Sequence, residues 1–176
     1  MSKTVLYIAT SLDGFVAGPD DDISWLFRYN EVDYGYAEFF SSIGAIIQGR
    51  RAYDIEAQHG WENAHPVPTF VLSHQARDPA LLRSGVVFTS EDIEAVLDRA
   101  RQLTTKKIWI EGGANVAQQF IRRDLIDEIV LSIVPIILGD GIRLFGKTDA
   151  PVELALRETK TFDKGLVQMT YTREGT

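Results

Sequence analysis

The sequence predicts an α/β protein built around a largely parallel sheet. Short apolar runs rich in β-branched and aromatic residues alternate along the chain with segments whose apolar residues recur at helical spacing. Strands that alternate with helices favour parallel pairing, with helices covering both faces of the sheet. The closing apolar runs have no long helix between them, which indicates an antiparallel edge at the C-terminal end of the chain.

Seven apolar runs are expected to form strands. Each run is short, and most are bounded by polar or glycine-containing segments, as strands buried in a sheet usually are. The expected strands cover residues 5–10, 45–48, 69–73, 86–89, 108–110, 128–134 and 165–172.

Four segments are expected to form helices. The clearest covers residues 91–103, where apolar residues keep helical spacing, acids occupy the first turn and arginines occupy the last, as the helix dipole prefers. A second helix is expected over residues 33–42, with Asp33 as its N-cap. The other two are expected to open at Gly49 and to run from Gly113 to Arg123.

Length and composition are those of a globular protein. The chain has 176 residues, which fits one domain over residues 1–176. Hydrophobic residues make up 45% and charged residues 24%, which excludes a largely disordered chain. Cysteine is absent, so disulfides, thiolate nucleophiles and cysteine-ligated metals are excluded.

Charge and hydropathy limit the classes of partner. The formal net charge is −7, whereas a nucleic-acid partner requires a basic face. The N-terminus has no signal-peptide layout, and the longest apolar run, residues 129–138, is too short to cross a bilayer. We therefore expect a cytoplasmic protein with a small-molecule substrate, and neither nucleic acid nor a membrane as partner.

A glycine pair follows the strand expected at residues 108–110. Glu111 precedes this pair, Gly112 and Gly113, and a helix is expected to follow it. Glycines at such a turn let backbone amides approach an anion, and the helix N-terminus supplies a favourable field. The alternative is a tight strand-to-helix turn without a ligand. The spacing is not GxGxxG, so an ordinary Rossmann site is unsupported.

Two further polar corners follow expected strands. Arg50 and Arg51 come directly after Gly49, where two guanidiniums can hold phosphate oxygens or can simply be solvated. Ser73 ends the strand expected at residues 69–73, and His74 follows it. The sequence contains no GxSxG or P-loop motif, and its histidines lack zinc-ligand spacing. Hydrolase, nucleoside-triphosphatase and metal-site interpretations are therefore disfavoured.

Five blocks together resemble the dihydrofolate reductase-like superfamily over nearly the whole chain. Each block is weak alone, but all five occur in the right order over the right length. They are residues 9–14 (ATSLDG), 24–25 (SW), 49–53 (GRRAY), 110–113 (IEGG) and 127–141 (DEIVLSIVPIILGDG). Within the superfamily, the chain resembles most the reductase domain of riboflavin-biosynthesis deaminase–reductases.

This resemblance implies a three-layer fold with a mixed eight-stranded sheet and an NADPH site made from the strand-end loops. It places Gly49, Arg50 and Arg51 at the diphosphate or ribose phosphate, and Leu72, Ser73 and His74 at the adenosine end. Gly112, Gly113, Ala114 and Asn115 would wrap the diphosphate from the other side, and Ala9 and the 12–15 loop with Gly14 would border the nicotinamide. No metal is implied.

Four polar residues are candidates for the substrate site. Counting back from Gly49 places Asp33 where true dihydrofolate reductases carry a pterin-binding acid, and Ser132 where they carry its hydroxyl partner. A buried carboxylate there could pair with an amino-pyrimidine edge and assist protonation. Asp33 could equally serve only as a helix N-cap. Glu111 and Asp13 are the competing candidates.

The blocks resemble two sub-families that act on different substrates. The Gly-Arg-x-x-Tyr pattern at residues 49–53 resembles true dihydrofolate reductases, whereas residues 11–14 and Glu111 resemble the pyrimidine reductases. We therefore expect an NADPH-dependent reductase of a flat, amino-substituted heterocycle, with a ribosylaminopyrimidine as the first candidate and dihydrofolate as the second. Trp25, Phe27 and Tyr34 could form an aromatic wall for such a ring or could be core. A catalytically silent nucleotide-binding module is the rival from another class.

The apolar segment at residues 135–139 bears on assembly. Pro135 cannot donate to a strand ladder, so this segment is expected to leave the sheet or to lie at its edge. An apolar edge needs a cover, which either the chain's own helices or a twofold partner could supply. The reductase domains that the chain resembles often pair through their sheets, which favours a homodimer.

Overall fold

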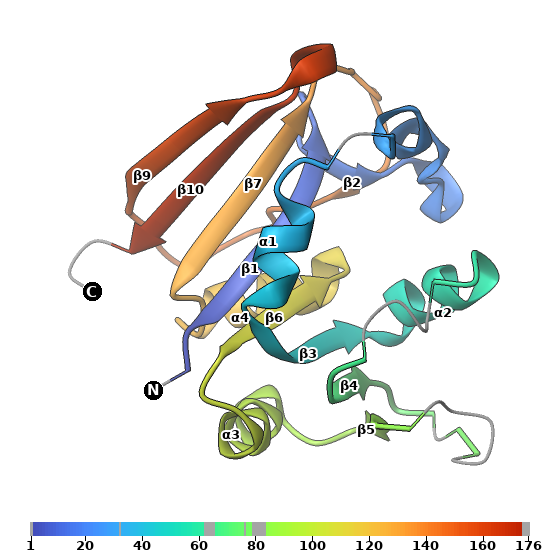
Figure 1. Ribbon diagram of the computed structural model, residues 1–176, viewed down its shortest axis with the longest axis vertical. Helices are drawn as coiled ribbons and strands as arrows, with labels where there is room; N and C mark the ends of the chain where they lie inside the picture. The colour runs from blue at the N-terminus through green and yellow to red at the C-terminus, as the bar shows by residue number, and fades with distance from the viewer. Residues whose placement is uncertain (1, 32, 62–65, 76, 79–83, 174–176) are drawn as a thin grey trace.

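The computed structural model describes residues 2–31, 33–61, 66–75, 77–78 and 84–173. Its main feature is an eight-stranded sheet (Figure 1). The strands are β1 (Thr4–Ser11), β3 (Ile43–Gly49), β4 (Thr69–Leu72), β5 (Val86–Thr89), β6 (Lys107–Gly112), β7 (Glu128–Val134), β9 (Leu154–Thr161) and β10 (Val167–Arg173). Their order across the sheet is β5-β4-β3-β6-β1-β7-β10-β9.

Strand direction in this sheet is mixed but mostly parallel. The first six strands in this order, which end with β7, pair in parallel. Strand β10 is antiparallel to both of its neighbours, β7 and β9. The parallel sheet and its antiparallel C-terminal edge were both predicted, and both predictions are confirmed.

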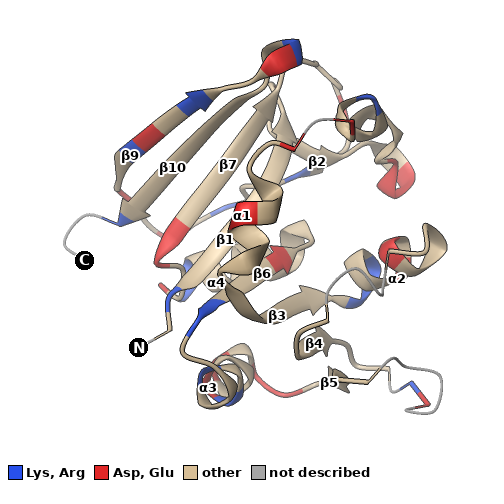
Figure 2. Cartoon of the chain, in the orientation of Figure 1, with Lys and Arg blue, Asp and Glu red and all other residues tan. Residues whose placement is uncertain are grey.

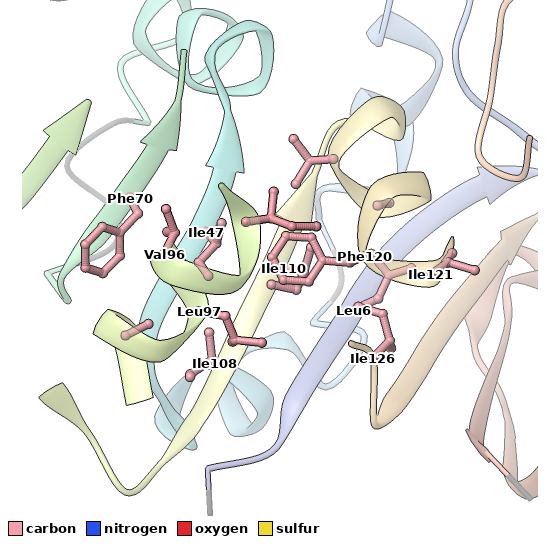
Figure 3. Close-up of a cluster of buried hydrophobic side chains, with 14 of the residues drawn as sticks. Leu6, Ile47, Phe70, Val96, Leu97, Ile108, Ile110, Phe120, Ile121 and Ile126 are labelled. Atoms are coloured by element: carbon pink, nitrogen blue, oxygen red, sulfur yellow. The ribbon is translucent and has the colours of Figure 1, made fainter. Parts of the chain in front are cut away.

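Four helices cover the two faces of the sheet, so the fold has three layers. They are α1 (Tyr36–Ser41), α2 (Arg50–Gln58), α3 (Ile93–Leu103) and α4 (Ala114–Arg122). Helices α3 and α4 pack on one face through the main apolar core, where Leu97 and Phe120 meet Ile108 and Ile110 (Figure 3). Helix α1 packs on the opposite face through Phe39 and Phe40, which contact the cluster around Trp109. Tyr53 brings α2 onto that same face.

Several short elements complete the fold. The ribbon of β2 (Phe15–Ala17) and β8 (Ile142–Arg143) and the 3₁₀ helices η1 (Pro19–Asp21), η2 (Ser24–Tyr29) and η4 (Asp163–Gly165) were not predicted. Strand β9 was also missed. Residues 156–161 of this strand are exposed and include several charged residues, so β9 lacks the apolar pattern by which the other strands were predicted.

Helix starts differ from prediction for a local reason. Helix α1 begins at Tyr36 and not at residue 33, because the chain from residue 33 to Gly35 turns outside the helix while the Asp33 carboxylate accepts the Tyr36 amide at 2.7 Å. Helix α3 begins at Ile93, because Asp92 takes the N-cap position and accepts the Glu94 amide at 3.1 Å.

The segment after β7 leaves the regular sheet, as predicted. Ile136 and Leu138 pack on a cluster around Trp25. The Leu12 amide donates to the Ile136 carbonyl at 2.8 Å, which ties this segment to the loop after β1. Ile137 between them is 70% exposed. Within the described ranges, no helix is both long and apolar enough to cross a membrane.

Candidate active site

The carboxyl ends of β1, β3, β4 and β6 lie at one edge of the sheet, because these strands run parallel. In the sheet register, Gln48 is opposite Gly112 and Gly49 is opposite Leu72. A Cβ placed on Gly49 would be 3.8 Å from the backbone nitrogen of Gly113. The structure therefore brings together glycines that are more than sixty residues apart in the sequence.

The turn from β6 into α4 is built for close approach. Gly112 has a φ of +107°, a conformation that side-chain-bearing residues rarely adopt, and the Gly112–Gly113 peptide is cis. Gly113 is the N-cap of α4 and has φ −62°, and no side chain caps the helix there. A Cβ on Gly113 would meet nothing within 4 Å. The first amides of α4, at Ala114 and Asn115, therefore begin a helix beside open space.

The predicted arginines lie at the start of α2 (Figure 2). Both are engaged in ion pairs. Arg50 contacts Asp54 at 3.5 Å, and Arg51 pairs with Asp21 of η1. All four side chains are at least partly exposed, so these pairs are weak and can exchange partners.

Ser73 and His74 lie just after β4, and their place at an adenosine stays a prediction. Ser73 follows Leu72, and its amide donates to the Thr89 carbonyl at 2.9 Å, which holds this corner beside β5. The Ser73 hydroxyl closes a local turn by donating to the carbonyl of Gln75 at 2.9 Å. His74 is exposed.

A cavity of about 520 Å³ opens between the η1–η2 segment and α2. Its wall includes Arg50 and Arg51 together with Phe27, Ile55 and His59. The volume is within the range usual for small-molecule sites.

A buried polar cluster lies on the sheet face that α1 covers. Ser132 lies opposite Ala9 in the register, and its hydroxyl accepts from Gln168 Nε2 at 3.1 Å. The same Gln168 nitrogen lies 3.3 Å from the Tyr7 hydroxyl, which in turn donates to the Tyr34 carbonyl at 3.3 Å. Burial raises the pKa of Tyr7, and the charge of Asp33 adds to this effect, whereas the Gln168 hydrogen bond opposes it. Sequence reasoning predicted Ser132 but missed Gln168.

Glu111 lies on the same face, beside Tyr36 of α1. Burial raises the pKa of Tyr36, and the negative charges of Glu111 and Glu56 raise it further. Gln48 Nε2 donates to Glu56 Oε2 at 3.2 Å, so β3 and α2 are joined on this face.

The two other predicted acids have structural tasks. Asp33 is exposed, which corrects the expectation of a buried carboxylate. The prediction of Asp33 as N-cap is also wrong, because Gly35 takes that position, although Asp33 Oδ1 accepts the Tyr36 amide just beyond it. Asp13 joins two loops: it accepts the Ser11 hydroxyl at 2.7 Å and the amides of Leu138 and Gly139 at 3.1 and 2.8 Å. These hydrogen bonds, that from Ser11 first, lower the pKa of Asp13 to about 2. A direct role of either acid with a substrate stays a prediction.

The remaining predicted residues have clear positions. Gly14 has φ +85°, and its carbonyl accepts the Leu144 amide at 3.0 Å, so it shapes the loop after β1. Trp25 is core, and Ala9 and Tyr34 pack against its cluster. Phe27 is instead 38% exposed and lines the cavity.

The fold and the glycine turn together define a dihydrofolate reductase-like protein. The RibD C-terminal domain family model matches residues 2–168, so the chain belongs to that family of riboflavin-pathway reductase-like domains. The chain is 34% identical to the uncharacterized protein YwjB of Bacillus subtilis (strain 168), over 97% of this chain and 98% of YwjB.

Solved structures agree with this assignment. A Shewanella sp. PV-4 protein assigned to riboflavin biosynthesis matches with a TM-score of 0.89 at 27% identity, over 98% of this chain and 99% of that one. The Thermotoga maritima deaminase/5-amino-6-(5-phosphoribosylamino)uracil reductase matches at 0.74 and 16% over 98% and 56%. Enterococcus faecalis dihydrofolate reductase, solved with NADP(H), matches at 0.68 and 18% over 98% and 96%. The last two similarities concern the fold alone.

Asp13→Asn should lower the melting temperature at pH 7, because the amide removes the charge that the Leu138 and Gly139 amides stabilise. The folded pKa lies near 2, below the value of about 3.9 in an unfolded chain. The stabilisation is therefore complete above about pH 4 and is lost as the pH falls towards 2. Thermal melts of both proteins across this window should converge at low pH. A difference in melting temperature that is independent of pH would contradict the stabilising role of the ionised Asp13 carboxylate.

Proposed function

We propose that this protein is an NADPH-dependent reductase of a small, amino-substituted heterocycle. It is either of the 5-amino-6-(5-phosphoribosylamino)uracil reductase type or a paralogue with a different substrate. The observation that carries the proposal is the open space beside Gly113 at the start of α4. Membership of the RibD C-terminal domain family and the fold shared with an NADP(H)-bound dihydrofolate reductase support it.

The residues at the strand ends suit the cofactor. Backbone amides at the α4 N-terminus are donors for diphosphate oxygens, and the absence of a side chain at Gly113 leaves room for them. Arg50 and Arg51 are exposed enough to exchange their carboxylate partners for phosphate oxygens. Ser73 and His74 continue this edge along β4 towards the adenosine end.

The cofactor, when bound, supplies a hydride to the heterocycle. The chain's own residues orient the substrate on the α1 face of the sheet. Ser132, Tyr7 and Gln168 form a hydrogen-bonded set that fixes polar atoms on the floor of this region. Asp33 accepts an amide at the start of α1, and Asp13 joins two loops. We therefore propose that the carboxyl group of Glu111 donates the proton that a ring nitrogen of the substrate takes up.

Two alternatives remain as outcomes of experiment. Dihydrofolate reductase activity would require the substrate's pterin ring to be held without the buried acid that was expected at Asp33, since Asp33 is exposed. A nucleotide-binding module without catalysis would bind the cofactor but would not oxidise it with any amino-substituted heterocycle.

NADPH should bind more tightly than NADH, because the extra phosphate adds charge for Arg50, Arg51 and His74 to recognise. The preference should shrink as the salt concentration rises, since exposed ion pairs are screened. Fluorescence-quenching titrations with both cofactors at low and high salt measure this. Equal affinities, or no binding, would contradict the cofactor assignment.

Gly113→Val should weaken NADPH binding by about tenfold or more, because the new side chain fills the space that the diphosphate needs. The melting temperature without cofactor should change little, since a Cβ has room there. Gly112→Ala is the contrasting variant: its φ of +107° makes any side chain strained, so its stability should fall without cofactor. A Gly113→Val protein that loses stability and keeps its affinity would identify a purely structural turn.

We also propose that the protein is a homodimer paired near residues 135–139. Ile137 is 70% exposed although its neighbours Ile136 and Leu138 are packed. Light scattering at micromolar concentration should give twice the mass of the chain. Ile137→Asp should then give a monomer or an aggregate, because a buried, unpaired carboxylate is costly. A monomeric wild-type protein would defeat the proposal, and a dimer unaffected by Ile137→Asp would place the interface elsewhere.

A further inference from the structure

The cavity between η1–η2 and α2 has an acidic lining. Among the described residues that form its wall, four aspartates face two arginines, a formal net charge of −2. Asp20, Asp21 and Asp22 come from η1 and its end, and Asp54 comes from α2. Hydrogen bonds from the backbone amide and hydroxyl of Ser24 lower the pKa of Asp22, so its carboxylate is ionised near neutral pH.

When the cofactor is bound, neither arginine in this wall is free for a phosphate on the substrate, because the proposed function gives both arginines to the cofactor's phosphates. Arg51 is paired with Asp21, and Arg50 is paired with Asp54, which Arg77 also contacts. If the cofactor's phosphates take over the two wall arginines, the aspartates that they leave make the wall more negative. In that cofactor-bound state, a phosphorylated substituent would face carboxylates, of which Asp54 keeps its contact with Arg77.

The same cavity has aromatic rings at its mouth. Phe27 of η2 and His59, which follows α2, both line it, with ring centroids 5.4 Å apart. Trp61 stacks on His59 at 4.6 Å and meets the Phe27 ring edge-on at 6.1 Å. Phe27 and Trp61 are each 38% exposed. A group of partly exposed rings offers an apolar surface to another flat group, and beside carboxylates it also suits a cation.

We propose that the part of the substrate held at this mouth is an aromatic group without an anionic charge, and that a sugar phosphate is excluded. This inference rests on the proposed function, because it takes the cavity as part of the binding site for the substrate. It separates this chain from a reductase of 5-amino-6-(5-phosphoribosylamino)uracil and selects the paralogue with a different substrate. Ile23 and Ile55, also in the wall, extend the apolar contact inward.

Calorimetric titration of the NADPH-saturated protein with three matched probes tests this inference. The probes are 2,4-diamino-5-benzylpyrimidine and its para-aminomethyl and para-carboxylate derivatives, which differ in charge at one point of the benzyl ring. The cationic probe should bind at least as tightly as the neutral one, and the anionic probe about tenfold or more weakly. Tighter binding of the anionic probe, or no binding of any probe, would overturn the inference.

Two variants locate the effect. Phe27→Ala should weaken the neutral probe by about three- to tenfold. The control variant Phe145→Ala, at a phenylalanine that is 48% exposed and lies outside the cavity wall, should not weaken it. Asp20→Asn removes one charge at a position with φ +57°, which Asn tolerates, and should strengthen the anionic probe about two- to fourfold. No change in either variant would remove the cavity from the substrate path.

The result is distinguishable from failure of the proposed function. A protein that does not bind NADPH fails the proposed function before any probe is added. A protein that binds NADPH and prefers the phosphorylated 5-amino-6-ribosylaminouracil over its dephosphorylated form keeps the proposed function and contradicts this inference.

Discussion

Parallel pairing of β1, β3, β4 and β6 is the constraint on which the candidate site depends. Strands that run in one direction end at one edge, and their turns into helices must meet there. In this chain the strand ends carry glycines: Gly49 is the last residue of β3, Gly112 is the last residue of β6, and Gly113 follows Gly112. A side chain at Gly113 would occupy the space beside the first amides of α4. The cofactor proposal follows from this single juxtaposition.

The two faces of the sheet have different chemistry. The face under α3 and α4 is an apolar core, in which Leu6, Ile108, Ile110 and Phe120 are fully buried. The face under α1 carries Tyr7, Ser132 and Gln168, joined by hydrogen bonds and largely buried. Polar groups in a low-dielectric interior stabilise a fold only when they are satisfied, so such a network is specific in geometry. We therefore place the substrate on this face and the structural core on the other.

Much of the fold could be predicted because its parallel strands are apolar and sharply bounded. Strands β5 and β7 occur over the predicted residues. Strand β5 lies between Gly85 and Ser90 and β7 between Asp127 and Pro135, and glycine, polar residues and proline are the kinds of residue that bound strands. Strand β9 could not be predicted, because an edge strand with Arg157, Glu158 and Lys160 reads as an exposed loop. The glycine turn and Ser132 were predicted as site residues. The structure places the turn at the carboxyl edge of the sheet and Ser132 in the buried polar cluster, and their roles stay predictions. Gln168 was missed because a lone polar residue in a terminal strand usually faces water, whereas its register opposite Ser132 turns it inward.

The central claim is that NADPH binds on the backbone of the Gly112–Gly113 turn and the first turn of α4. Amide chemical shifts recorded by NMR during a titration with NADPH test it most directly, because they report on the backbone groups themselves. The account predicts that the amide signals of Gly113, Ala114 and Asn115 move most and saturate together. Signals that stay in place there while others shift, or no shift at all, would contradict it.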